Sequence, residues 1–232
     1  MTKRQILFRN RCYIMLVNDK SAYYRKQTPN GRFYFKDEIP YPSVTTIIGH
    51  KKNTGKSRGP GPSAHIGTIV HKKILGRYSK NVLPVSCNPI WNIPREEVYG
   101  RINRCIKMWN DLHLSIQPFF VETSLFNKNP PYAGTLDMLA KISCNNDLLD
   151  IHFKMELFLM DLKTGLQYYD SHVAQAAAYW QALRRKPKVM FIYLDSIIDR
   201  NPEQLPVVKI FSQEELENGY DLFMYDYIDF EY

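Results

Sequence analysis

The sequence predicts an α/β protein in which helices flank a mixed central sheet. Two observations predict this fold class. Three strand-like segments follow one another in the centre of the chain, and a helix, further strands and a last helix come after them. Hydrophobic residues make up 44% of the 232 residues, which is enough to bury a core.

The chain shows no internal repeat, no low-complexity tract and no linker that divides it. We therefore expect a single domain over residues 1–232. Within it we expect an N-terminal β extension at 1–40, a core at 41–195, and a C-terminal strand and helix at 196–232.

The first sixty residues are predicted to form short strands followed by a basic loop. Residues 11–17 and 32–35 are rich in strand-forming side chains, and the turn sequence TPNGR lies between them. Ser43 is a good N-cap, so the stretch after it opens either a short strand or a helix. Residues 50–62 combine glycine, proline and basic side chains, which predicts a mobile basic loop.

The rest of the chain is expected to form four helices and five strands. The helices are predicted at 63–78, at 94–113, at the alanine-rich 171–185, and from Ser212 onward, where Ser212 and Glu215 have the spacing of a capping box. The strands are predicted at 117–126, 135–143, 155–163, 187–195 and 206–211.

The charge of the chain points to an anionic partner. The formal charge is +8 and the sequence pI is about 9.2, which indicates either a polyanion, nucleic acid above all, or a generally basic surface. An aromatic share of 13% adds rings that can stack on bases, although most of them are expected to pack.

The cysteines and the N-terminus indicate where the protein resides. Cys12, Cys87, Cys105 and Cys144 lie far apart without a C-x-x-C pair, which argues against zinc, a redox dithiol or a disulfide framework. The N-terminus lacks the continuous apolar region of a signal peptide, and no apolar run is long enough to span a bilayer. We therefore expect a cytoplasmic protein that makes no membrane contact.

The stretch MDLKTG at 160–165 places a carboxylate and an ammonium two residues apart at the end of an apolar strand. Strand side chains alternate between faces, so Asp161 and Lys163 are expected to point the same way and Leu162 the opposite way. Both charges need partners beside a low-dielectric core. By itself, the pair is explained by a salt bridge at a strand end.

Two further acids lie on the two preceding strands. If the three strands form an antiparallel meander, pairing brings Glu122, Asp137 and Asp161 to one edge of the sheet. Carboxylates at close range repel one another unless a cation joins them, and Mg²⁺ is bound by carboxylates together with water and phosphate. Lys163 beside such an ion could orient water or stabilise charge on a phosphate, which is the chemistry of phosphodiester hydrolysis.

The alanine-rich helix carries a polar face that can reach the same edge. Gln175 and Tyr179 are four residues apart, and His172 lies three residues before Gln175 on nearly the same face. Small alanines between them allow the helix to pack close to the sheet. The alternative is a solvated glutamine and a tyrosine that only packs.

Together these segments resemble the PD-(D/E)XK nuclease superfamily in its RecB-like exonuclease branch, which includes phage and mitochondrial genome maintenance exonucleases. The stretch PSVTTII at 42–48 is also similar to the lead-in of several phage and mitochondrial members. The matching motifs, in family order, are HIGTIVH ending in His71, VETS with Glu122, AGTLDML with Asp137, MDLKTG with Asp161 and Lys163, and QAAAYW with Gln175 and Tyr179.

The resemblance implies a fold of the restriction-endonuclease type and a divalent metal site. Asp137, Asp161 and the carbonyl of Leu162 would be metal ligands. His71 would be a ligand or a near neighbour of the metal, and Glu122 would reach it directly or through water.

The same resemblance assigns roles to the remaining motif residues. Lys163 would be the catalytic lysine, and Gln175 and Tyr179 would hold this lysine or the DNA backbone. A related branch carries an iron–sulfur cluster on one upstream cysteine and three cysteines near the C-terminus. No cysteine follows Cys144, so we expect no cluster and packed thiols instead.

Basic and aromatic side chains outside the motifs are candidates for DNA contact, with a solvated loop or ordinary packing as the alternative. They are Lys51, Lys52, Lys56 and Arg58 of the basic loop, Tyr168 and Tyr169, His172, and Arg184 and Arg185 after the alanine-rich helix. NTGKS at 53–57 lacks the glycine spacing of a phosphate-binding loop, which makes a nucleotide-hydrolysing motor the weakest function class.

We therefore expect a Mg²⁺- or Mn²⁺-dependent deoxyribonuclease, and the family resemblance implies that its cleavage would leave 5′-phosphates. Exonuclease action on single-stranded DNA or DNA ends is the first choice, and a single-strand or flap endonuclease the second. A DNA-binding module of the same fold without catalysis is the alternative. Polarity, homo-oligomerisation and association with replication, repair or recombination proteins stay open, as does a viral or phage origin.

Overall fold

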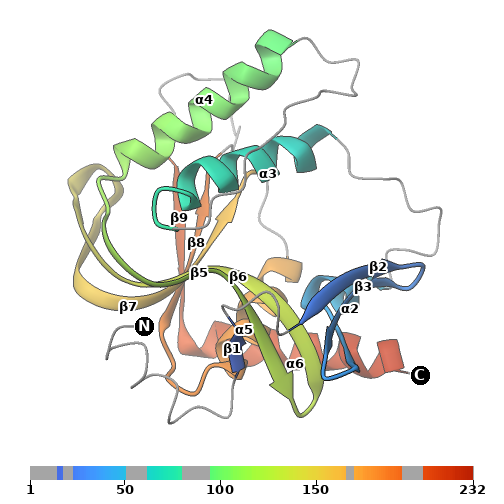
Figure 1. Cartoon of the computed structure of the whole chain (residues 1–232). Helices are drawn as coiled ribbons and strands as arrows, with labels where there is room; N and C mark the ends of the chain where they lie inside the picture. Colours follow the sequence, from blue (N-terminus) through green and yellow to red (C-terminus); the bar gives the residue numbers. More distant parts are fainter. Residues whose placement is uncertain are drawn as a thin grey trace.

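A computed structural model describes residues 15–17, 23–50, 62–79, 95–165, 170–194 and 206–231. A sheet of six strands forms its centre (Figure 1), in the order β1-β5-β6-β7-β8-β9. The strands are β1 (Met15–Val17), β5 (Ser115–Lys128), β6 (Pro131–Asn146), β7 (Ile151–Lys163), β8 (Lys188–Tyr193) and β9 (Val207–Phe211). Only β7 and β8 pair in parallel, so the sheet is mixed.

Helices cover both faces of this sheet. On one face, α3 (Pro62–Leu75) and α4 (Arg95–Asp111) share an apolar cluster with the strands, and on the other face α5 (Asp170–Ala182) and α6 (Gln213–Glu231) do the same. Figure 1 shows the sheet between these two helical layers. The predicted α/β class, with a mixed central sheet flanked by helices, is confirmed.

The central strands follow the predicted meander. β5 pairs with β6 and β6 with β7, each time antiparallel. The chain then crosses over through α5 and returns as β8 parallel to β7, which is the usual role of a helix between parallel strands. The end of β7 therefore lies close in space to α5, the helix that follows it in the sequence.

A second sheet of three strands corrects the prediction for the N-terminal region. It consists of β2 (Tyr24–Thr28), β3 (Gly31–Lys36) and β4 (Ile39–Pro42), and α2 (Val44–Gly49) follows it. The TPNGR turn joins β2 to β3, and β1 instead pairs with β5 at the edge of the large sheet. β2 was missed because its side chains are exposed on both faces and lack apolar alternation.

Several local signals behave as predicted. Ser43 caps α2, accepting the N–H of Thr46, so the stretch after it is a helix. Ser212 and Glu215 exchange backbone-to-side-chain hydrogen bonds in a capping box at the start of α6. α6 carries seven acidic side chains and no lysine or arginine.

Two of the four cysteines lie in the described ranges. Cys105 and Cys144 are buried, as expected for packed thiols, whereas Cys12 and Cys87 lie outside these ranges. None of the helices in the described part of the chain is long and apolar enough to cross a membrane.

Candidate active site

Asp137 and Asp161 lie where the pairing of β6 and β7 ends. The last antiparallel pair is Met138 with Met160, so the two aspartates occupy the next opposed position. At this position a side chain joins the two strands in place of a backbone hydrogen bond. The N–H of Leu162 donates a hydrogen bond of 2.8 Å to Asp137 Oδ2. Both carboxylates are buried, with 9% of Asp137 and 5% of Asp161 exposed.

Asp161 and Lys163 point to the same face, as the alternation of strand side chains predicts. Lys163 Nζ lies 2.6 Å from Asp161 Oδ2 and donates a hydrogen bond of 2.9 Å to Gln175 Oε1. The Gln175 side chain also donates to Asp161 Oδ1 at 3.3 Å. One glutamine of α5 therefore holds both members of the D-x-K pair, which fits the role expected for Gln175.

Tyr179 packs one helical turn after Gln175, against a glycine of β6. A Cβ added at Gly134 would lie 2.4 Å from Tyr179 Cε1 and 2.6 Å from its hydroxyl oxygen. Burial is the main cause that raises the pKa of Tyr179 well above its usual value, and the nearby Asp161 adds to it. Tyr179 is thus a neutral, buried support of Gln175 and does not contact Lys163 through a hydrogen bond in the described structure.

His71 approaches the aspartates from α3, on the other face of the sheet. Its Nδ1 lies 3.4 Å from Asp137 Oδ2. Burial favours the neutral ring, but the charges of Asp137 and Asp161 outweigh burial and raise the His71 pKa to about 9. His71 therefore lies beside the acidic pair, and its role as a ligand or near neighbour of a metal stays a prediction.

The two carboxylates differ in their electrostatic surroundings. The pKa of Asp161 is raised to about 6, because burial and the charge of Asp137 together outweigh the lowering effect of Lys163. Burial also disfavours the ionised form of Asp137, but His71, the N–H of Leu162 and Lys163 together hold its pKa below the ordinary value. The neighbours of Asp137 therefore stabilise its ionised form, whereas the ionised form of Asp161 is disfavoured.

The donor atoms at this point fit a hard divalent cation. Asp161 Oδ2 is buried, and apart from the ion pair with Lys163 it has no partner of hydrogen-bonding geometry in the described residues. The carbonyl of Leu162 points to the same side of β7 as its N–H, and therefore toward Asp137. Carboxylate and carbonyl oxygens with one imidazole are ligands suited to Mg²⁺ or Mn²⁺.

Glu122 lies beside this pair but does not complete it. Val121 pairs with Met138 and Thr123 with Leu136, which places Glu122 opposite Asp137 in the register of β5 and β6. Glu122 has a φ of 45°, and its side chain is exposed. In the described part of the chain no three His, Cys, Asp or Glu side chains form a ready metal cage. A ligand role for Glu122, direct or through water, stays a prediction.

The residues predicted to contact DNA are only partly described. Lys51, Lys52, Lys56, Arg58, Tyr168 and Tyr169 lie outside the described residues. Arg184 and Arg185 are exposed in the bend that follows α5, which ends at Ala182 and not at residue 185 as predicted. His172 Nδ1 lies 3.1 Å from the hydroxyl oxygen of Tyr193, close to the end of β8.

Sequence reasoning missed one contact of Lys163 and one of the next residue, Thr164. Lys163 Nζ lies 4.6 Å from the ring centre of Phe191 on β8, a cation–π distance. A Cβ added at Gly67 of α3 would lie 2.7 Å from the hydroxyl of Thr164, so this glycine lets the helix that carries His71 approach the end of β7. The parallel pairing of β8 with β7 accounts for the contact of Lys163 with Phe191. The contact of Gly67 with Thr164 depends on where α3 packs, which no local sequence pattern predicts.

A scan of the chain against protein-family models gives no match, and a search of curated proteins gives none either.

Proposed function

We propose that the protein is a divalent-metal-dependent deoxyribonuclease with a fold of the restriction-endonuclease type, similar to the RecB-like branch of the PD-(D/E)XK nucleases. One observation carries the proposal: two buried aspartates from adjacent strands meet at the end of their pairing, with a lysine two residues beyond the second one. A structural salt bridge needs only Asp161 and Lys163. It does not need a second buried carboxylate or a shared glutamine.

Asp137, Asp161 and the Leu162 carbonyl would hold Mg²⁺ or Mn²⁺, with His71 as a further ligand or a neighbour. A bound divalent ion supplies charge that activates water and polarises a phosphate. Asp161 gains most from cation binding, because burial makes its ionised form costly. Asp137 is kept ionised by its neighbours and is ready to accept the ion.

Lys163 has the geometry of a group that acts on the substrate. Its side chain is 15% exposed, so the ammonium can reach a bound phosphate while Gln175 and Asp161 hold it in place. An ammonium stabilises the negative charge that develops on a phosphate during hydrolysis. Gln175 and Tyr179 position this ammonium and need not touch the substrate.

DNA is the proposed substrate because the chain carries a formal charge of +8. Exonuclease action on single strands or DNA ends is our first choice, and cleavage of single strands or flaps the second. A DNA-binding module without catalysis is the second candidate function. One observation favours it: the described residues contribute two carboxylates to the site, and Glu122 stays exposed beside them.

End-labelled single-stranded DNA with Mg²⁺, with Mn²⁺ or with chelator separates these candidates. We expect metal-dependent cleavage by the wild type and its loss in Lys163→Met. Lys188→Met is the matched control, because Lys188 forms an ion pair with Glu156 at the far end of the same strand pair. DNA binding without metal-dependent cutting in the wild type would refute the nuclease and support the module.

The same assay on circular and end-blocked DNA distinguishes the two modes of cleavage. An exonuclease needs a free end and leaves circles intact, whereas an endonuclease cuts circles. The product ladder on linear strands labelled at one end or the other gives the polarity.

A further inference from the structure

The small sheet carries a group of cations that the proposed catalytic chemistry does not use. Residues 24–36, which form β2, β3 and their turn, contain four basic side chains and no acidic one. Arg25, Lys26 and Arg32 are exposed, whereas Lys36 is buried. A hairpin whose charges are all positive is suited to an anionic partner.

The strand register sorts these cations onto two faces. Arg25 is opposite Tyr34 and Gln27 is opposite Arg32, so these four side chains lie on one face of the hairpin. Lys26 is opposite Phe33 and lies on the other face. We call the exposed surface made by Arg25, Gln27 and Arg32 the arginine face.

The arginine face is attached to the large sheet beside the acidic pair. The hydroxyl of Tyr34, on the same face, lies 3.0 Å from the hydroxyl of Thr135 on β6. Thr135 precedes Asp137 by two residues, a distance of about 7 Å along the strand. The buried Tyr34 therefore joins the small sheet to β6, while Arg25 across from it stays exposed.

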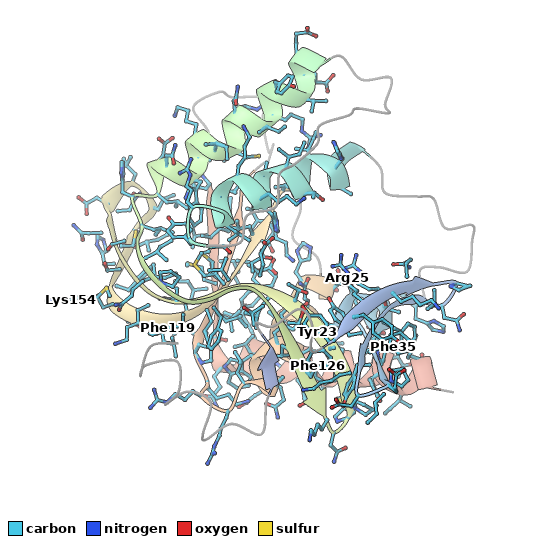
Figure 2. The ribbon with its side chains drawn as sticks, viewed as in Figure 1. Tyr23, Arg25, Phe35, Phe119, Phe126 and Lys154 are labelled. Carbon is cyan, nitrogen blue, oxygen red and sulfur yellow. The ribbon has the colours of Figure 1, made fainter. Side chains whose placement is uncertain are left out.

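β2 is an edge strand of the small sheet, and it is exposed along nearly its whole length. In Figure 2, Arg25 extends from β2 toward the side on which α3 lies, and α3 is the helix that carries His71. The arginine face thus begins next to β6 and continues away from the aspartates along β2.

We propose that the arginine face binds the phosphates of the single DNA strand whose scissile bond lies at Asp137 and Asp161. This inference rests on the proposed nuclease function. Guanidinium groups bind phosphate oxygens through two parallel hydrogen bonds, and the Gln27 amide adds a neutral donor between them. Contacts to phosphates position a strand without reading its sequence, so binding to the arginine face should not depend on the base sequence.

Charge-matched variants on the two faces of β2 test this assignment. Arg25→Gln and Lys26→Gln each remove one exposed cation from adjacent residues of the same strand, but from opposite faces. The probe is fluorescent oligothymidylate, titrated by anisotropy in chelator over a salt series. Losing one phosphate contact lowers the salt slope for single strands by about 0.7, which corresponds to about a fivefold weaker affinity at about 0.1 M salt.

We expect this loss for Arg25→Gln, a further loss when Arg32→Gln is added, and a clearly smaller effect for Lys26→Gln. A second readout is cleavage of p-nitrophenyl thymidine 5′-phosphate, a phosphodiester too short to reach the arginine face. Arg25→Gln should raise KM for the oligonucleotide and leave the rate on the short substrate unchanged.

The outcomes separate this inference from the function on which it rests. If the wild type binds and cuts DNA but Arg25→Gln and Lys26→Gln weaken binding equally, the phosphate-binding role of the arginine face is refuted and the nuclease proposal stands. A wild type that neither binds nor cuts any DNA overturns both. A fall in the rate on the short substrate would show that Arg25 acts at the reacting bond, and would refute the strand-guiding role.

Discussion

The close approach of Gly134 to Tyr179 predicts that a larger residue at position 134 would disturb the candidate site. A methyl group at position 134 would lie 2.4, 2.6 and 2.8 Å from three atoms of the Tyr179 side chain. Carbon atoms in contact are normally about 3.5 Å or more apart, so the ring must move by about 1 Å. Tyr179 is buried among α5, α6 and the sheet, which leaves it little space.

We expect Gly134→Ala to lower the free energy of unfolding by about 1–3 kcal/mol, the usual cost of overpacking a core. Urea denaturation followed by fluorescence measures this loss. Because Gln175 lies one turn from Tyr179 and holds Lys163, metal-dependent cleavage should also fall. Gly165→Ala is the control, since an added Cβ there would meet nothing within 4 Å.

A double-mutant cycle tests whether the ring is the cause. Tyr179→Leu removes the atoms that the new methyl group would meet, although it has its own cost. In this background Gly134→Ala should be less destabilising than in the wild type by about 1 kcal/mol or more. Equal costs in both backgrounds, or a neutral Gly134→Ala, would refute the packing argument.

Three further changes have expected outcomes that denaturation measurements can check. Lys163→Met removes the cation that lowers the Asp161 pKa, so the metal-free variant should lose about 3 kcal/mol at pH 8 and much less at pH 5, where Asp161 can be protonated. Glu215→Gln should cost about 1 kcal/mol at pH 7, with a pH dependence of the same sign in a more acidic range: the hydrogen bonds with Lys209 and Ser212 outweigh burial and lower the Glu215 pKa below its ordinary 4.5, so the difference disappears as the pH falls through that range. Gly31→Ala should cost about 2 kcal/mol, because Gly31 has a φ of 117° and an added Cβ would lie 2.3 Å from the Thr46 side chain.

Each of these has a clear contrary result. A Lys163→Met penalty that does not change with pH would mean that Asp161 is not the group left without its partner. A Glu215→Gln penalty that grows in acid would contradict the capping-box explanation. An unaffected Gly31→Ala would show that α2 can move away from β3 at little cost.

Local periodicity was enough to predict the centre of the molecule. The alternation of strand side chains placed Asp161 and Lys163 on one face, and the helical spacing placed Gln175 and Tyr179 on one face of their helix; that Gln175 holds Lys163 was implied by the family resemblance. The meander of three strands followed from their order and short connections, and it brought Asp137 to Asp161. These inferences hold because they depend on neighbours in the sequence or on adjacent strands.

The remaining features depend on tertiary placement. β2 is exposed on both faces, so no hydrophobic pattern distinguished it from a loop. Strand pairing put Glu122 at the predicted register position. Its positive φ could not be predicted, because a glutamate in the sequence gives no sign of an unusual backbone conformation. The approach of Gly67 to Thr164 depends on where α3 lies, and sequence periodicity contains no information about that.

The acidic composition of α6 has a consequence for encounters in solution. With seven carboxylates and no cation on one helix of a chain whose formal charge is +8, the positive charge must be concentrated elsewhere. The molecule is therefore an electric dipole as well as a net cation. A polyanion diffusing toward it experiences a torque before any contact forms, and this torque turns α6 away from the polyanion.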